Sequence, residues 1–203
     1  MKKYGIMGGT FNPIHLAHLY IAYEAKERLN LDKIIFLPTG APPHKKDESI
    51  IDSKSRYEMV EKAIEGYEDF VIDDYEIKKL GYSYTYETLK HFNEEGVEIY
   101  FIAGGDSLMD VEKWRNTKEV LTECNFVVFN RGKFTKEILL EQKYKLDSKY
   151  GCNIIVLDVL DMDISSSVIR EKLRNGKRVD FFLPKDIINY IDKNDLYKGE
   201  WDV

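Results

Sequence analysis

Two glycines, a threonine and two histidines stand close together near the start of the chain and could bind an anion. They occur in the stretch GGTFNPIHLAH, where Gly8 and Gly9 permit close approach of the backbone and Thr10 adds a hydroxyl. His15 and His18 are three residues apart, so they share one face of a helix that begins there. N–H groups at a helix start attract phosphate oxygens, and imidazole can donate to them and offset developing charge. The stretch therefore predicts a phosphate site between a first strand and a first helix.

Three serines and an arginine near the other end of the chain offer related chemistry. Ser165, Ser166 and Ser167 are expected to begin a helix, which leaves N–H groups and hydroxyls able to meet an anion. Arg170 lies one turn further along, where its guanidinium fork can reach the same anion. A serine cap beside a solvated arginine is common, so this cluster indicates an anion site only in combination with the glycine and histidine stretch.

Residues in the middle of the chain could hold a sugar and a planar ring. Gly104 and Asp106 follow the apolar run VEIYFIA, where a carboxylate can accept hydrogen bonds from a ribose. Trp114 offers a flat face, and stacking of a nucleic-acid base on such a face is worth about 1–3 kcal/mol. Tyr84 and Thr85 stand at a predicted helix start, whose N–H groups can receive a carboxylate.

The histidines and cysteines do not form a metal site by their spacing. His44 is the nearest further candidate ligand to His15 and His18, and no cluster of acids or cysteines has zinc spacing. The two cysteines, Cys124 and Cys152, belong to no C-x-x-C pair. We therefore expect no metal ligated by protein side chains and no disulfide framework.

Strands alternate with helices along the chain, and this order predicts where in the fold the candidate site residues lie. Six short apolar runs predict strands: KYGIM, KIIFLP, FVID, VEIYFIAGG, NFVVFNR and NIIVLDV. This order favours an α/β fold, a doubly wound, mostly parallel, Rossmann-like sheet of about six strands covered by helices on both faces. We expect a single domain over 1–203 with a small C-terminal helical portion at 165–203. Ligands bind beyond the carboxyl ends of such strands, where the loops after YGIM, IIFLP and YFIA all lie.

Composition narrows the choice of partners. The chain has 36 acidic against 30 basic residues and a net charge of -6, which disfavours nucleic acid and anionic membranes because both select basic surfaces. It has no long apolar run of the kind that spans a membrane or forms a signal peptide. We expect a cytoplasmic protein with small-molecule ligands, and the sequence leaves the oligomeric state open.

The two terminal clusters together resemble a known superfamily. GGTFNPIHLAH resembles the G-G-x-F-D-P-x-H-x-G-H signature of the nucleotidylyltransferases, with Asn12 in place of the usual aspartate and Ala17 in place of the usual glycine. MDISSSVIREKLRNG resembles the serine-and-arginine element that binds the triphosphate of ATP in that superfamily. Both clusters occur in the expected order at opposite ends of the chain.

Further segments resemble those of one family in that superfamily, the nicotinate-nucleotide adenylyltransferases. These segments are FLPTGAPPHKK, GYSYTYETL, FIAGGDSLMDVEKWRN and FLPKDIINYIDKNDLY, so the resemblance extends from Tyr4 to about Tyr197. It implies an enzyme that transfers AMP from ATP, accompanied by Mg²⁺, to nicotinate mononucleotide in NAD biosynthesis, with pyrophosphate as the second product.

The resemblance also implies a role for each candidate residue. The catalytic group of positive donors comprises His15, His18, Lys45 and Arg170. The ATP and phosphate group comprises Gly8, Gly9, Thr10, Phe11, His44, Ser165, Ser166 and Ser167. The mononucleotide group comprises Tyr84, Thr85, Gly104, Asp106 and Trp114.

Other functions remain open at this point. A sister adenylyltransferase would use nicotinamide mononucleotide or phosphopantetheine as acceptor. A class I aminoacyl-tRNA synthetase core carries a related histidine signature, but the length and acidic charge disfavour it. A non-catalytic nucleotide sensor would be expected to lose His15, His18 or Arg170, and all three are present.

Overall fold

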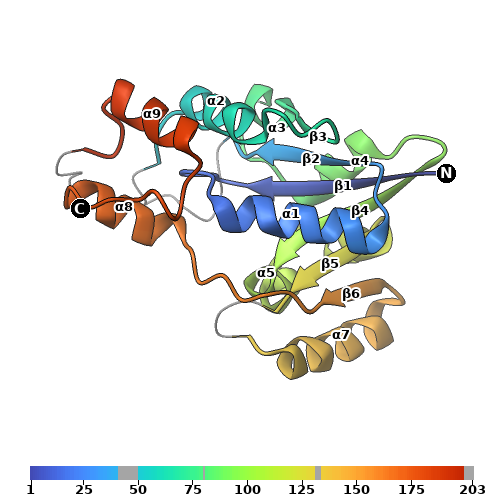
Figure 1. The fold of residues 1–203 in the computed structure, drawn as a ribbon. Helices are drawn as coiled ribbons and strands as arrows, with labels where there is room; N and C mark the ends of the chain where they lie inside the picture. Colours follow the sequence, from blue (N-terminus) through green and yellow to red (C-terminus); the bar gives the residue numbers. More distant parts are fainter. Residues whose placement is uncertain (41–49, 80, 131–133, 199–203) are drawn as a thin grey trace.

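Six parallel strands form one sheet within the part of the chain that the computed structural model describes, residues 1–40, 50–79, 81–130 and 134–198. Their order is β3-β2-β1-β4-β5-β6 (Figure 1), and every neighbouring pair is parallel. The order reverses between β1 and β4, which makes their carboxyl ends the switch point of the sheet. The predicted α/β sheet is confirmed. The strands are β1 (Lys2–Gly9), β2 (Lys33–Pro38), β3 (Phe70–Ile72), β4 (Val97–Gly104), β5 (Asn125–Phe129) and β6 (Asn153–Leu157).

Helices cover both faces of the sheet. One face is covered by α1 (Leu16–Leu29), α2 (Ser53–Ile64), α8 (Ser166–Arg174) and α9 (Lys185–Lys193). The other is covered by α4 (Thr85–Phe92), α5 (Gly105–Asp110), α6 (Thr117–Thr122) and α7 (Lys136–Tyr150). The short α3 (Tyr75–Lys78) and the 3-10 helix η1 (Val111–Lys113) lie in loops. Figure 1 shows α8 and α9 beyond the carboxyl end of β1.

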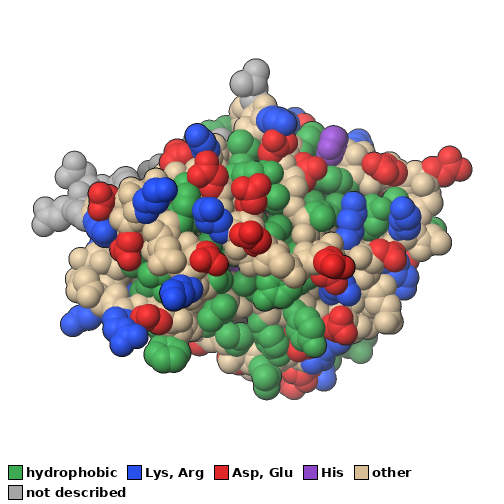
Figure 2. All heavy atoms as spheres, turned by 45° about the horizontal axis from the view of Figure 1, so that its top comes forward, with side chains coloured by type: hydrophobic (Ala, Val, Ile, Leu, Met, Phe, Trp, Pro, Cys, Tyr) green, Lys and Arg blue, Asp and Glu red, His purple; other side chains and the backbone are tan. Residues whose placement is uncertain are grey.

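The surface mixes charges of both signs. On the face drawn in Figure 2, Lys and Arg side chains are interspersed with Asp and Glu. Some form pairs one helical turn apart, such as Arg28 with Glu24 at 2.6 Å, and such pairs contribute about 0.3–0.5 kcal/mol each. Across the described ranges, no helix is both long and apolar enough to cross a membrane.

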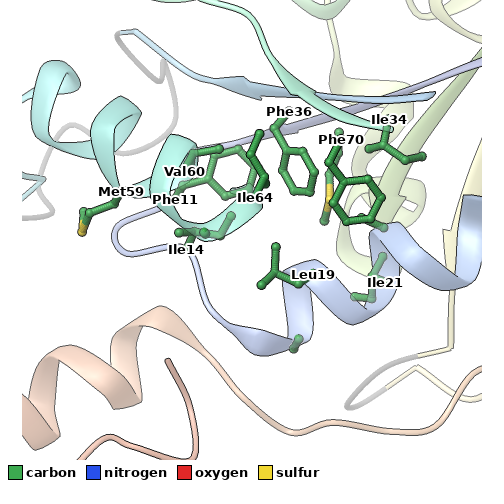
Figure 3. Close-up of a cluster of buried hydrophobic side chains, with 14 of the residues drawn as sticks. Phe11, Ile14, Leu19, Ile21, Ile34, Phe36, Met59, Val60, Ile64 and Phe70 are labelled. Carbon is green, nitrogen blue, oxygen red and sulfur yellow. The ribbon is translucent and has the colours of Figure 1, made fainter. Parts of the chain in front are cut away.

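The core anchors the turn that follows β1. Phe11 and Ile14 from this turn pack with Phe36 of β2 and with Met59 and other residues of α2 (Figure 3). Phe11 is 2% exposed, and its ring centroid lies 6.1 Å from that of Phe36. Full burial of such a side chain contributes about 1.5–3 kcal/mol, so the apolar residues inside the turn fix its backbone.

The helix α7 is not predicted from the sequence pattern. It is rich in Lys and Glu, and Leu139 and Leu146 are the fully buried residues among its described positions, seven residues apart. That pattern is too sparse to produce a clear amphipathic signal. Parallel neighbours such as β5 and β6 nevertheless require a crossover of a dozen or more residues, and α7 provides it.

Candidate active site

A cavity of about 540 Å³ lies where the carboxyl ends of β1 and β4 meet. Its position is the switch point at which open α/β sheets bind ligands, and its volume is in the range of small-molecule sites. Residues from the turn after β1, the start of α4 and the segment after β4 line it together. The predicted site residues among them are Gly8, Gly9, Thr10, His18, Tyr84, Thr85, Gly104 and Trp114.

The turn over residues 8–14, called the glycine turn below, has an unusual backbone. Phe11 has a φ of 49°, in the left-handed region that a bulky residue rarely adopts. Asn12 is buried, and its side-chain oxygen accepts hydrogen bonds from the Tyr197 hydroxyl at 2.9 Å and from the Ile51 N–H at 3.4 Å. Asn12 therefore serves as more than a turn residue, because it connects the glycine turn to the end of the chain.

The two histidines of the sequence pattern lie together, as their spacing predicts. His15 caps α1 and is 1% exposed, whereas His18 lines the cavity. Their rings stack with centroids 3.7 Å apart, and the His15 N–H donates to Nδ1 of His18 at 3.3 Å. An Nδ1 that accepts places the proton of a neutral imidazole on Nε2. The His18 ring therefore carries its own N–H donor on Nε2.

The serine–arginine cluster packs on the glycine turn. Ser165 caps α8 by accepting from the Val168 N–H at 3.3 Å. Ser166 Oγ donates to the Pro13 carbonyl at 2.9 Å, and Arg170 Nη1 donates to the Asn12 carbonyl at 2.9 Å. The structure thus brings the two predicted clusters together across the length of the chain. These side chains stand beside the cavity and are absent from its described lining.

The far wall of the cavity carries the aromatic residues. Tyr84 caps α4, and the Arg115 guanidinium lies 5.0 Å from the centroid of its ring. Trp114 packs edge-on against Phe101, with ring centroids 6.3 Å apart, and still lines the cavity. Two groups, a ring surface and a helix start, therefore face the same space.

The remaining predicted residues lie elsewhere. Phe11 is in the core and His15 is behind His18, while Asp106 is exposed on α5 and does not line the cavity. His44 and Lys45 lie outside the described residues.

Several cavity residues are absent from the sequence prediction. Lys113 and Arg115 flank Trp114, and this basic pair beside an aromatic residue is a signal that could have identified them. Glu76 gives no such signal, because its stretch DDYEIKK reads as a solvated loop. Its side chain is nevertheless buried, which raises the pKa of its carboxyl, and it accepts from Thr88 Oγ1 at 2.7 Å.

The acidic and histidine side chains do not gather into a metal centre in the described part of the chain, where no group of three or more His, Cys, Asp or Glu could hold an ion.

The sheet order, the histidine-bearing turn at the switch point and the serine–arginine helix beside it define a nucleotidyltransferase. In agreement, the family model described as cytidylyltransferase-like matches residues 6–172. A Clostridium botulinum protein (strain Eklund 17B) is 55% identical and a Clostridium perfringens protein (strain SM101) is 51% identical to this chain. Each alignment covers 98% of this chain and 100% of the relative, and both relatives carry the name "Probable nicotinate-nucleotide adenylyltransferase". The chain belongs to the nicotinate-nucleotide adenylyltransferase family.

Solved structures share the fold at lower identity. The nicotinic acid mononucleotide adenylyltransferase of Plasmodium falciparum, complexed with NaAD, superposes with a TM-score of 0.79 at 22% identity. The same enzyme complexed with APC gives a TM-score of 0.77, also at 22% identity. Both alignments cover 97% of this chain and 98% of the other chain.

Proposed function

We propose that this chain transfers AMP from ATP to nicotinate mononucleotide, giving nicotinate adenine dinucleotide and pyrophosphate in NAD biosynthesis. The observation that carries the proposal is the cavity, which joins the glycine turn and His18 at one end to Tyr84, Thr85 and Trp114 at the other. One end offers donors for a polyphosphate, and the other offers a stacking surface and helix N–H groups for a ring with a carboxylate.

The reaction needs positioning and charge neutralisation more than a protein nucleophile. An oxygen of the mononucleotide phosphate attacks the α-phosphorus of ATP in line, and the bond from that phosphorus to the bridging oxygen breaks to release pyrophosphate. His18 donates to the developing charge from the cavity wall, and the N–H groups of Gly8, Gly9 and Thr10 hold the phosphates. His15 stacks behind His18 and fixes the orientation of its ring.

The remaining donors approach from the sides of the phosphate site. Arg170, which donates to the Asn12 carbonyl, reaches the triphosphate with its guanidinium, and the start of α8 at Ser165, Ser166 and Ser167 offers N–H groups to the same phosphates. Phe11 shapes the turn from the core. We propose that His44 and Lys45, outside the described residues, also reach the phosphates.

The acceptor binds at the other wall of the cavity. The pyridine ring stacks on Trp114, and its carboxylate receives the N–H groups at the start of α4 near Tyr84 and Thr85. Gly104 leaves room for the ribose, and Asp106, two residues further on in α5 and outside the cavity lining, accepts from a ribose hydroxyl that extends past the wall.

Magnesium enters with ATP in this proposal. The polyphosphate and water supply its ligands, since the described residues offer no acidic cage. We further propose that 1–203 acts as one domain in the cytoplasm, with α8 and α9 as its C-terminal helical portion. A homo-oligomer is compatible with this account.

Pyrophosphate release from ATP with a panel of acceptors tests the proposal. The purified chain should release pyrophosphate fastest with nicotinate mononucleotide, and mass spectrometry should identify nicotinate adenine dinucleotide as the product. Parallel reactions with nicotinamide mononucleotide and phosphopantetheine distinguish the sister enzymes. Fastest release with phosphopantetheine, or release that needs no acceptor, would contradict the proposed function.

A further inference from the structure

Arg56 is a buried cation to which the proposed reaction gives no role. It lies in the first turn of α2 and is 1% exposed. Its guanidinium donates to the Thr10 carbonyl at 2.8 Å, the Gly40 carbonyl at 3.1 Å and the Ile51 carbonyl at 3.2 Å. Burial lowers the pKa of Arg56, and Tyr197 and Asp52 oppose that effect more weakly.

The acceptors of Arg56 are neutral and come from separate segments. Thr10 belongs to the glycine turn, Gly40 follows β2 and Ile51 precedes α2. No carboxylate of the described residues forms an ion pair with Arg56, and the oxygens of Asp52 accept from the backbone and hydroxyl of Ser55. Within the described ranges the guanidinium is thus held by neutral carbonyls, and a buried charge held in this way is costly.

The contact with Thr10 fixes the direction of the next N–H group. Carbonyl and N–H point to opposite sides of a trans peptide plane. Because the Thr10 carbonyl points at Arg56, the Phe11 N–H points away from it. Phe11 also has the positive φ of 49°, a conformation that persists only where the surroundings enforce it. Arg56 on one side and the aromatic core on the other supply that enforcement.

We propose that Arg56 is a positioning residue for ATP. Its guanidinium holds the glycine turn in the conformation that presents N–H groups to the phosphates, and its buried positive charge favours the polyphosphate that binds beyond the turn. The inference rests on the proposed function in placing ATP at the glycine turn. Arg56 then acts on the binding of ATP and not on the binding of nicotinate mononucleotide.

Two substitutions of Arg56 distinguish the effect of its planar guanidinium from the effect of its positive charge. Arg56→Lys keeps a positive charge but loses the planar fork that joins the carbonyls. It should raise KM for ATP about tenfold or more, the size expected when hydrogen bonds to a charged group are lost, with KM for the acceptor little changed. Arg56→Met removes the charge as well and should raise KM for ATP further. Lys54→Met is the matched control, because Lys54 lies on the same helix with its side chain 85% exposed, and it should leave both KM values unchanged.

The competing explanation is a purely structural role. In that case the variants would melt at lower temperature, the active fraction would fall, and both KM values would stay at the wild-type level or rise together. Either result overturns the proposal. Calorimetry gives the dissociation constant of ATP for the wild type and for each Arg56 variant in the absence of an acceptor. This comparison is valid even if the acceptor is not nicotinate mononucleotide.

A measurement on the wild-type chain covers the case in which the variants do not fold. In protein labelled with ¹⁵N-arginine, the Arg56 Nε–H resonance should shift and exchange more slowly when ATP is added, and should not respond to nicotinate mononucleotide. An unchanged Arg56 resonance at saturating ATP would refute the role.

Discussion

His18 is the single residue whose loss should most directly reduce the rate of the chemical step. It lines the cavity, and its Nδ1 accepts from the His15 N–H, which places the N–H of the imidazole ring on Nε2. His18→Ala should lower turnover about 10²–10³-fold, as when one transition-state donor is removed, while ATP affinity changes less. Steady-state pyrophosphate release gives both quantities.

His91→Ala is the matched control for that substitution. His91 is exposed on α4, stacks on Tyr75 with ring centroids 3.9 Å apart and does not line the cavity. Its loss should leave turnover near the wild-type level. Near-normal turnover in folded His18→Ala protein would remove His18 from catalysis.

Residue types and local spacing predicted part of the site because those features are local. Three-residue spacing is enough to place His15 and His18 side by side. The spacing cannot show that His15 is buried while His18 lines the cavity, because burial depends on which other segments of the chain pack against the two rings. Arg56 and Glu76 were missed for the same reason, since both sit in polar stretches whose burial is a tertiary effect.

At the scale of elements, surface ion pairs join the wall that carries Trp114 to α7. This wall includes η1, a single short turn with little stability of its own. Glu112 of η1 accepts hydrogen bonds from Lys145 and Lys149 of α7, each at 2.7 Å. The helix that the sequence pattern does not reveal therefore contacts the turn just before Trp114, whose ring packs on Phe101 and Phe126 of the sheet.

The Glu112 contacts predict a defined pH dependence. Hydrogen bonds from Lys145 and Lys149 lower the pKa of Glu112 from 4.5 to about 2. A carboxyl with a lowered pKa in the folded state stabilises the protein above its unfolded pKa, and the effect is lost as pH falls through the folded pKa. Glu112→Gln should therefore lower Tm at pH 7, and the difference from wild type should shrink between about pH 4.5 and pH 2.

Thermal unfolding across that pH range, followed by circular dichroism, checks the prediction. High salt should reduce the difference at pH 7, since the three side chains are partly exposed. A Tm difference that persists unchanged below pH 2 would show that Glu112 acts through packing and not through its charge.

At the scale of the whole molecule, the site depends on bringing the two ends of the chain together. Ser166 and Arg170 donate to carbonyls of the glycine turn, and the Tyr197 hydroxyl donates to Asn12, 185 positions away in sequence. Strand alternation predicted that the loops after β1, β2 and β4 share one edge of the sheet, because parallel topology alone requires it. It could not predict how α8 is joined to the glycine turn, since those hydrogen bonds are made by polar side chains that look solvated in sequence.

The proposed function requires the cavity to select a mononucleotide with a carboxylate on its ring. The most direct test is kcat/KM for nicotinate mononucleotide against nicotinamide mononucleotide, with ATP saturating and the same enzyme preparation for both. If the N–H groups near Tyr84 and Thr85 receive the carboxylate, the acid should be preferred by at least about tenfold, equivalent to about 1.4 kcal/mol. Equal kcat/KM for the acid and the amide would contradict the account.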